Sequence, residues 1–227
     1  MSRLSIVIPV LNEGERIATA LDALAGLRAL GVEVIVADGG SGDTTVQQAR
    51  LRVDRLVSAQ RSRALQMNAG AACASGDVLL FLHADTQLPA DAHHVVLNGL
   101  ERSGRRWGRF DLSIDSRHPV LLVVALLMRW RSRLSGIATG DQAIFVRRDA
   151  FHAVGGFPEL PLMEDIELCK RLKRLGRPLC LRERVVTSAR RWEKNGILPT
   201  IALMWRLRVA YFFGADPKTL AHRYGYD

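Results

Sequence analysis

The chain has 227 residues, 48% of them hydrophobic, which excludes a disordered protein and allows one α/β domain with its own core. The formal net charge is +9, which favours anionic partners such as nucleotides, nucleic acids or a bilayer surface without selecting one. Three scattered cysteines form no C-x-x-C pair, so neither a zinc site nor a disulfide framework is predicted and a reducing, cytoplasmic location is expected.

The first half alternates short apolar runs with amphipathic segments. Strands are predicted at residues 4–8, 32–37, 55–57 and 76–82, and helices from Asn12 to about Leu30, from Thr44 onward and through residues 65–72. Pro9 is expected to end the first strand, because proline cannot donate to a sheet ladder. Asn12 and Glu15 are expected to form the capping box of the first helix, and Asp43 to cap the second. This alternation predicts a parallel, doubly wound sheet with right-handed connections.

The stretch from Gly76 to Asp85 reads G-D-V-L-L-F-L-H-A-D, with five apolar residues in a row before a polar triplet. A run this short is typical of a strand buried on both faces. Open α/β sheets bind ligands at the carboxyl ends of their strands. A carboxylate there can hold a divalent cation, since magnesium uses one or two carboxylates plus phosphate oxygens of the substrate. Asp85 could equally cap the helix expected after Pro89.

The second half mixes helices and strands less regularly. Helices are predicted at residues 89–100, 119–133, from Asp149 to Gly155, at 163–175 and at 196–214, and strands at 106–113, 143–146 and 185–188. Met163-Glu164-Asp165 opens one of these helices, with both acids in its first turn.

Polar residues follow every strand of the first half. They are Asn12 and Glu13, then Asp38, then Arg61 and Arg63, then His83 and Asp85. The dinucleotide fingerprint G-x-G-x-x-G is absent after the first strand, where P-V-L-N-E-G stands, and no Walker-type loop is present. An acid after the second strand can hold a base or ribose, arginines can reach phosphates, and Asp85 can hold a metal that bridges a diphosphate. The sequence therefore predicts a nucleotide-diphosphate site without a P-loop.

Five pieces of the sequence, in this order, carry a family resemblance: I-V-I-P-V-L-N-E, A-D-G-G-S-G-D-T, a DxD-like H-A-D, G-D-Q-A-I-F and M-E-D-I-E-L. Together they resemble the inverting glycosyltransferases of family 2, which have the GT-A fold. The resemblance covers about residues 4–192. It implies one α/β domain over residues 1–227, with a Rossmann-like, doubly wound, mostly parallel sheet, a small antiparallel acceptor-side portion and C-terminal helices.

Within this domain, residues 1–105 would form the nucleotide-sugar-binding half, 106–192 the acceptor and catalytic half, and 193–227 a helical tail. The resemblance also implies roles for single residues. Pro9, Val10, Asn12, Glu13, Asp38, Arg63, Asp85, Arg191 and Trp192 would bind the nucleotide-sugar; Gly140, Asp141 and Glu164 would lie on the acceptor side; and Asp165 would be the catalytic base.

Asp85 would coordinate Mn²⁺ or Mg²⁺. The first acid of the DxD motif is His83 in this chain. Histidine is a tolerable manganese ligand but a poor magnesium ligand, so Asp85 is the expected metal ligand and His83 a further candidate.

The implied activity is metal-dependent transfer of a sugar from a UDP- or GDP-sugar to an acceptor hydroxyl, with inversion and with Asp165 as general base. One alternative is a nucleotide-sugar-binding protein without transferase activity. Another is a sugar-phosphate nucleotidyltransferase, which would carry a glycine-rich, basic loop after the first strand that P-V-L-N-E lacks. No nucleic-acid partner is expected, because aromatic residues make up only 6% of the chain.

Several candidate residues also have purely structural interpretations. Asp38 could form a turn, Asp141 could cap one, Arg61 and Arg63 could lie on a solvated face, and Trp192 could pack in the core. Glu164 could replace Asp165 as the base; the position in the motif favours Asp165.

Two late segments, 119–133 and 197–213, combine apolar and basic residues. The longest uninterrupted apolar run, Pro119 to Met128, falls well short of the ~20 residues of a membrane-spanning helix. No signal peptide is predicted, since the first apolar run is short and contains Pro9. The segments suit core packing, a homodimer contact or, with their arginines and tryptophans, the inner face of the cell membrane. A lipid-linked acceptor would explain contact with the membrane; the acceptor itself is not identified by the sequence.

Overall fold

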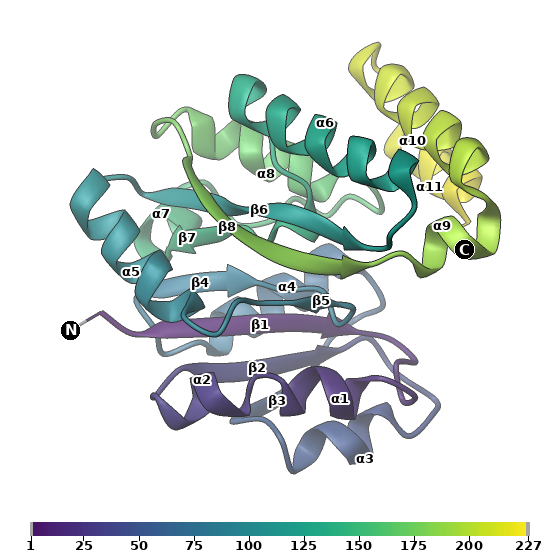
Figure 1. The fold of residues 1–227 in the computed structure, drawn as a ribbon. Coiled ribbons are helices and arrows are strands. Elements are labelled where there is room, and N and C mark those ends of the chain that lie inside the picture. The colour runs from purple at the N-terminus through teal and green to yellow at the C-terminus, as the bar shows by residue number, and fades with distance from the viewer. Residues whose placement is uncertain (1, 226–227) are drawn as a thin grey trace.

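The computed structural model describes residues 2–225 as an eight-stranded sheet with helices on both faces (Figure 1). The strands are β1 (Leu4–Val10), β2 (Glu33–Asp38), β3 (Arg55–Ser58), β4 (Val78–Phe81), β5 (Thr86–Gln87), β6 (Trp107–Asp115), β7 (Phe145–Arg147) and β8 (Leu179–Ser188). The helices are α1 (Ile17–Asp22), α2 (Ala25–Ala29), α3 (Thr45–Arg50), α4 (Arg63–Cys73), α5 (Ala92–Ser103), α6 (Pro119–Ser135), α7 (Arg148–Ala153), α8 (Glu164–Lys173), α9 (Arg190–Asn195), α10 (Ile197–Phe212) and α11 (Pro217–Tyr224), with one 3₁₀ turn, η1 (Gly140–Gln142).

The strand order is β3-β2-β1-β4-β7-β6-β8-β5. Strands β1 to β4 pair in parallel, β7 runs antiparallel to β4 and β6, β8 is parallel to β6, and β5 is antiparallel to β8. Only β5 and β7 therefore oppose the common direction within the described residues. This confirms the predicted mostly parallel sheet with a small antiparallel portion.

The central strands are buried on both faces because successive side chains point to opposite sides of a sheet. Ile6 and Ile8 of β1 pack in one layer with α1, α2, α5 and α6. Val7, between them, packs in the other layer with α4, α7 and α8. The continuous apolar runs of the sequence follow from this double coverage.

Strand β1 continues through Pro9 to Val10, so the prediction that Pro9 ends the strand is wrong. Val7 accepts a hydrogen bond from the Leu82 N–H on the β4 side, and pairing with β4 stops at Val7. Since backbone groups alternate along a strand, the missing N–H of Pro9 faces the side where no partner strand continues. On the other side, Val10 still pairs with Asp38 of β2.

The predicted capping box of Asn12 and Glu15 does not form. Asn12 has φ 53°, and its side-chain Oδ1 accepts from the Gly42 N–H of the loop after β2 (2.9 Å) rather than from the helix. The first helix begins only at Ile17, and α1 and α2 replace the single predicted helix. Asp43 does accept from the N–H of Thr45, the first residue of α3 (2.9 Å).

The late helices are placed by a small core of their own. Leu207 of α10 and Leu220 of α11 pack with Met163 and Ile166 at the start of α8. This packing brings the C-terminal helices beside the segment that carries the predicted catalytic acids. Within residues 2–225, every helix is either too short or too polar to cross a membrane.

Candidate functional site

An open cleft lies where the carboxyl end of β4, the η1 turn and the start of α8 meet, with α10 and α11 on its far side. Arg63, His83, Gly140, Asp141, Glu164 and Asp165 line it. The fold thus brings six of the predicted site residues together from four separate segments of the chain.

Asp165 is held by backbone donors on both carboxylate oxygens. The Gly140 N–H donates to Oδ2 (2.8 Å), and the Ile166 N–H donates to Oδ1 (2.7 Å). The side chain is partly exposed to the cleft. A carboxylate fixed in this way can meet an acceptor hydroxyl in one orientation, as a general base requires.

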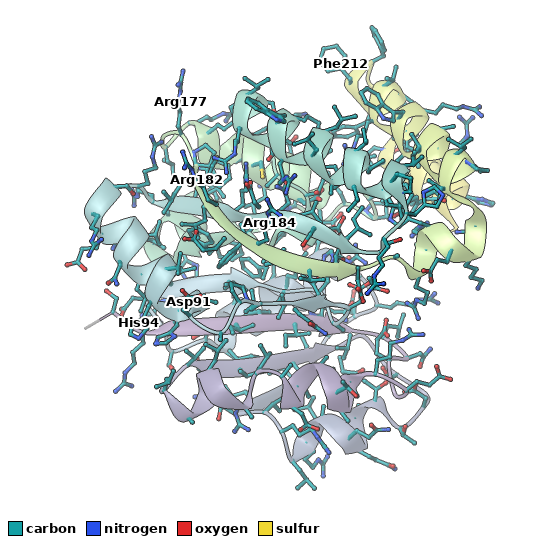
Figure 2. All side chains as sticks on the ribbon, viewed as in Figure 1. Asp91, His94, Arg177, Arg182, Arg184 and Phe212 are labelled. Carbon is teal, nitrogen blue, oxygen red and sulfur yellow. The ribbon has the colours of Figure 1, made fainter. Side chains whose placement is uncertain are left out.

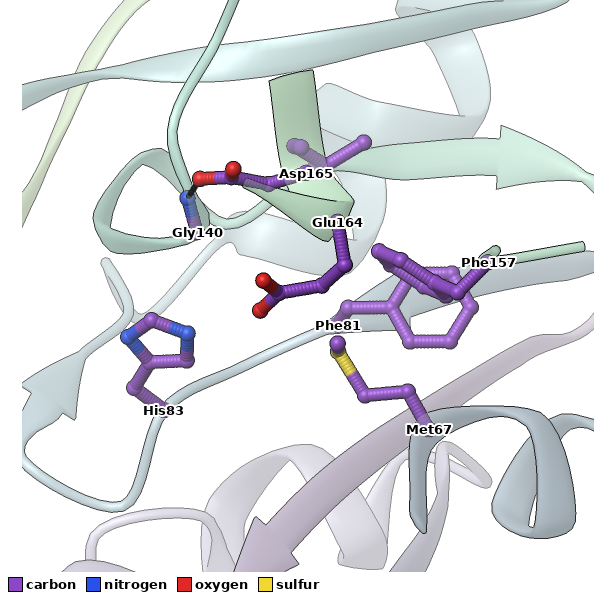
Figure 3. Close-up of a pocket in the computed structure, with 8 residues that line it drawn as sticks. Met67, Phe81, His83, Gly140, Phe157, Glu164 and Asp165 are labelled. Atoms are coloured by element: carbon purple, nitrogen blue, oxygen red, sulfur yellow. Dashed lines mark hydrogen bonds between the residues drawn. The ribbon is translucent and has the colours of Figure 1, made fainter. Parts of the chain in front are cut away.

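Glu164 is buried and points in a different direction. Figure 3 shows its carboxyl group directed toward His83, above the side chains of Met67, Phe81 and Phe157, whereas Asp165 turns toward Gly140. Burial, and then the neighbouring charge of Asp165, raises the pKa of Glu164 to about 7. Glu164 therefore binds a proton in the folded protein over part of the pH range in which an exposed glutamate is ionised.

Glu164→Gln is expected to change how stability depends on pH. Because the pKa of Glu164 rises from 4.5 to about 7 on folding, the unfolded chain releases this proton first, and the free energy of unfolding falls as pH rises from about 4.5 to about 7. Glutamine removes this dependence. The stability of the variant relative to the wild type should increase by on the order of 3 kcal/mol between pH 4 and pH 8. Urea unfolding at a series of pH values measures this difference; parallel profiles would contradict it.

His83 is bound to the η1 turn. Its Nδ1 lies 3.3 Å from Asp141 Oδ1, and a Cβ added at Gly140 would lie 2.4 Å from His83 Nε2. Burial works against ionisation of Asp141, but the hydrogen bond from His83 and the charges of His83, Arg63 and Arg208 outweigh it and lower the pKa of Asp141. Gly140 thus allows the imidazole to lie against the turn that orients Asp165.

The acids that follow β1, β2 and β4 lie within electrostatic reach of each other. Burial raises the pKa of Glu13; Arg16 opposes this, Asp85 and Asp43 add to it, and Arg63 opposes it. The Asp85 side chain is partly exposed and accepts a long hydrogen bond from Thr86 Oγ1 (3.4 Å). Arg63, the first residue of α4, lines the cleft, and its charge lowers the pKa of Glu164 and Asp141 as well as that of Glu13.

The loops after β1 and β2 are hydrogen-bonded to each other and within themselves. The Asn12 N–H donates to Ser41 Oγ (2.9 Å). Asp38 is buried, and its carboxylate accepts from the N–H groups of Gly40 and Ser41 (3.0 Å each). Asp38 therefore forms a turn in this structure, and its contact with a base stays a prediction.

Gln66, on α4, ties the ends of two strands together. Its buried Nε2 donates to the carbonyl oxygens of Val10 (2.7 Å) and Ala37 (2.9 Å). The predicted nucleotide residues Pro9 and Val10 lie at this point, in the paired part of β1. Sequence reasoning missed Gln66, because a single glutamine in an amphipathic helix is usually exposed.

The predicted R-W pair is divided between two environments. Trp192 is buried in the main core. Arg191 stacks on Tyr224 of α11, with its guanidinium carbon 3.6 Å from the ring centroid, and donates to the Tyr224 carbonyl (3.1 Å). Tyr224 lines the cleft and Arg191 does not, so Arg191 contacts the cleft wall through Tyr224.

Two more residues support the site without having been predicted. The buried Gln142 donates from Nε2 to Ser132 Oγ of α6 (3.1 Å) and so fixes η1. Arg208 reaches the cleft from α10. No periodic signal could have placed Arg208 there, because the position of α10 is set by tertiary packing.

Left-handed backbone at non-glycine residues occurs at three places near this edge of the sheet. Among residues 2–225, the non-glycine residues with positive φ are Asn12 (53°), Ala143 (45°) and Met163 (68°). They adjoin the end of β1, the η1 turn and the Glu164-Asp165 pair. Non-glycine residues in this conformation are uncommon and cluster at functional sites.

The sheet order and the cleft at its carboxyl edge define the GT-A fold. The model of the family "Glycosyl transferase family 2" matches residues 5–154, so the chain belongs to glycosyl transferase family 2. The predicted fold and family are both confirmed.

Individual relatives agree with this assignment. The chain is 25% identical over 239 residues to the probable glycosyltransferase YdaM of Bacillus subtilis (strain 168), covering 94% of this chain and 55% of YdaM. The mannosyltransferase PcManGT from Pyrobaculum calidifontis, in complex with GDP-Man and Mn²⁺, has a TM-score of 0.67 at 20% identity, over 99% of this chain and 69% of that one. S. aureus TarS 1-349 in complex with UDP-GlcNAc has a TM-score of 0.66 at 17% identity, over 82% of this chain and 58% of that one. The chain thus spans little more than half the length of YdaM or of the TarS 1-349 fragment.

Proposed function

We propose that this chain transfers a sugar from a UDP- or GDP-sugar to an acceptor hydroxyl, with inversion at the anomeric carbon and with help from a divalent metal. The observation that carries the proposal is the Asp165 carboxylate, fixed by Gly140 and Ile166 at the wall of a cleft whose donor side carries Arg63. Membership of the family supports the reaction class.

The chemistry is a single displacement. The acceptor hydroxyl gives its proton to Asp165 as its oxygen forms a bond to the anomeric carbon. The bond from that carbon to the diphosphate oxygen breaks, and the nucleoside diphosphate leaves with the electron pair. Attack from the side opposite the leaving group inverts the anomeric carbon. Arg63 can stabilise the charge that grows on the departing diphosphate.

The oxygen and nitrogen ligands that the protein offers fit a metal ion that binds together with the nucleotide. Within the described residues, no group of three or more His, Cys, Asp or Glu side chains is placed to hold a metal ion. Magnesium commonly uses only one or two carboxylates plus substrate phosphates, and Asp85 offers such a carboxylate. Asp85 would therefore hold Mn²⁺ or Mg²⁺, with His83 as a further ligand; bound there, the ion would neutralise diphosphate charge. The Mn²⁺ in the PcManGT complex is consistent with this use.

Residues 1–105 would bind the donor and residues 106–192 the acceptor, with the C-terminal helices closing one side of the cleft. Glu13, Asn12 and Asp38 would face the nucleoside, and Gly140, Asp141 and Glu164 the acceptor. Both UDP and GDP are considered because the two structural neighbours carry different nucleotides. The three cysteines are all unpaired, in keeping with a cytoplasmic location.

Nucleotide binding tests the donor half of this proposal. The unfolding temperature of the wild-type chain is measured with UDP, GDP, dTDP or ADP, each with Mn²⁺ or with EDTA. We expect UDP or GDP to raise it with Mn²⁺ and much less with EDTA, since binding to the folded state alone stabilises it. Equal shifts with all four nucleotides, or none with any, would contradict the proposed donor site.

A further inference from the structure

Helix α6 carries an apolar face that no part of residues 2–225 covers. Leu122, Val123, Leu126, Leu127, Trp130 and Leu134 are between 43% and 81% exposed. Their spacing places them along one side of the helix. The opposite side, with Leu121, Ala125 and Met128, packs in the main core. Both sides of α6 are therefore apolar, although only one of them is used by the fold.

Helix α10 repeats this arrangement. Leu198, Trp205, Val209, Phe212 and the following Phe213 are between 48% and 84% exposed. Figure 2 shows Phe212 at the outer end of α10, pointing away from the sheet. The other side of α10 carries Met204, Leu207 and Arg208, which line the cleft.

The two faces lie on the same side of the molecule (Figure 1). Ile197, Ile201 and Met204 of α10 pack against the core cluster that contains Leu121 and Ala125 of α6. We name the exposed residues of both helices the α6–α10 apolar face. Single exposed apolar residues are ordinary, whereas many of them on two neighbouring helices mark an interaction surface.

The charges around this face favour one kind of partner. Neither α6 nor α10 contains an aspartate or glutamate. The arginines of α6 are half-buried, and Arg133 pairs with Asp111 of β6, so the exposed cations near the face come from α10 and α11. Arg206 of α10 is exposed, as are Lys218 and Arg223 of α11, which packs beside α10. A second copy of the chain would bring these three exposed cations near the same three of its partner, which is unfavourable. An anionic lipid surface would pair with them and also cover the leucines and aromatic rings.

We propose that the α6–α10 apolar face inserts into the headgroup region of an anionic bilayer. Tryptophan and phenylalanine would sit at the acyl boundary, and the flanking arginines and lysine would contact lipid phosphates. Since α10 has this face on one side and the cleft on the other, the bilayer lies next to the cleft. This inference rests on the surface alone and stands whether or not the proposed transferase activity is found.

Vesicle sedimentation tests the inference. Wild-type protein is mixed with vesicles of phosphatidylcholine alone or of equal parts phosphatidylcholine and phosphatidylglycerol. We expect binding to the vesicles that contain phosphatidylglycerol, weakened by about 0.5 M salt because the electrostatic part is screened. The variant Leu127→Glu/Trp205→Glu should lower the partition coefficient at least about 10-fold. Leu51→Glu, at an 86% exposed leucine directly after α3, which contacts the edge strand β3 far along the sheet from β6 and α6, should leave it unchanged.

A second variant, Phe212→Glu/Phe213→Glu, keeps the test valid should the first fail to fold, because both rings are more than 80% exposed. Circular dichroism shows that each variant is folded. No sedimentation of the wild type with either vesicle, or equal partition of wild type and folded variants, would overturn the inference. So would sedimentation velocity showing a wild-type dimer that the variants dissociate, since the face would then be a contact between copies.

Discussion

Asp165→Asn is expected to lower the rate of sugar transfer by about 10²- to 10⁴-fold, the range typical of a lost general base. The affinity for the nucleotide should change less than about 2-fold, since Asp165 is proposed to act on the acceptor hydroxyl and not to hold the nucleotide. The fold should persist: the asparagine oxygen can still accept one of the two backbone hydrogen bonds, from Gly140 or Ile166, and losing the other costs about 1 kcal/mol. Transfer rate and nucleotide affinity are measured on the same preparation.

Two control variants make this result specific. Glu159→Gln changes an exposed acid near the same helix and should leave the rate unchanged. Glu164→Gln tests the competing assignment, because Glu164 and Asp165 are adjacent and both line the cleft. A large loss in Glu164→Gln with little loss in Asp165→Asn would make Glu164 the base. Equal loss of rate and nucleotide affinity in Asp165→Asn would show that Asp165 binds the donor instead.

Asp85→Asn should remove the metal-dependent part of nucleotide binding. The affinity for the nucleoside diphosphate with Mn²⁺ is expected to fall at least about 10-fold, because even residues that only orient metal ligands are worth that much. Affinity in EDTA should be nearly the same as in the wild type, since asparagine keeps the size and the acceptor oxygen of the side chain. Calorimetric titration with Mn²⁺ and with EDTA measures the metal-dependent and the metal-independent affinity for the nucleotide separately.

The matched control for this variant is Asp91→Asn, at an exposed aspartate before α5 whose side chain makes no cap hydrogen bond. It should bind the nucleotide as the wild type does. If Mn²⁺ strengthens nucleotide binding to Asp85→Asn as much as to the wild type, Asp85 is not the metal ligand.

The sheet could be predicted from the sequence because its signals are local. Runs such as Val78 to Phe81 are apolar throughout, and a β-α alternation has one usual handedness. Parallel strands end at one edge, so the polar residues after them could be expected to lie together. Arg63, after β3, and His83, after β4, do line one cleft. Gly140 and Asp165 join them from a turn and a helix of the second half.

The local signal at Asn12 was ambiguous. Asparagine is favoured both as a helix cap and in the left-handed conformation, and here the contacts of the loop favour the left-handed conformation.

The first part of β8 gave no local signal. Strand β8 begins at Leu179, six residues before the predicted start. A register shift between Arg109 and Asp111 of β6 leaves Arg182, Glu183 and Arg184 exposed in succession (Figure 2). This irregularity removes the alternation by which a strand is recognised.

The support of the site could not be predicted because it depends on tertiary contacts. The buried Gln66 donates to a backbone oxygen of β1, and the buried Gln142 donates to a hydroxyl oxygen of α6. Arg208 reaches the cleft because Leu207, its neighbour, packs on the start of α8. None of these contacts leaves a periodic pattern in the sequence.

Release of nucleoside diphosphate from a panel of UDP-, GDP- and dTDP-sugars, with Mn²⁺ or with EDTA, tests the central claim most directly. We expect release from one donor class with Mn²⁺, little release in EDTA, and loss of the activity in both Asp165→Asn and Asp85→Asn. If no donor is cleaved and no nucleoside diphosphate raises the unfolding temperature, the chain is not the nucleotide-sugar-dependent transferase proposed above.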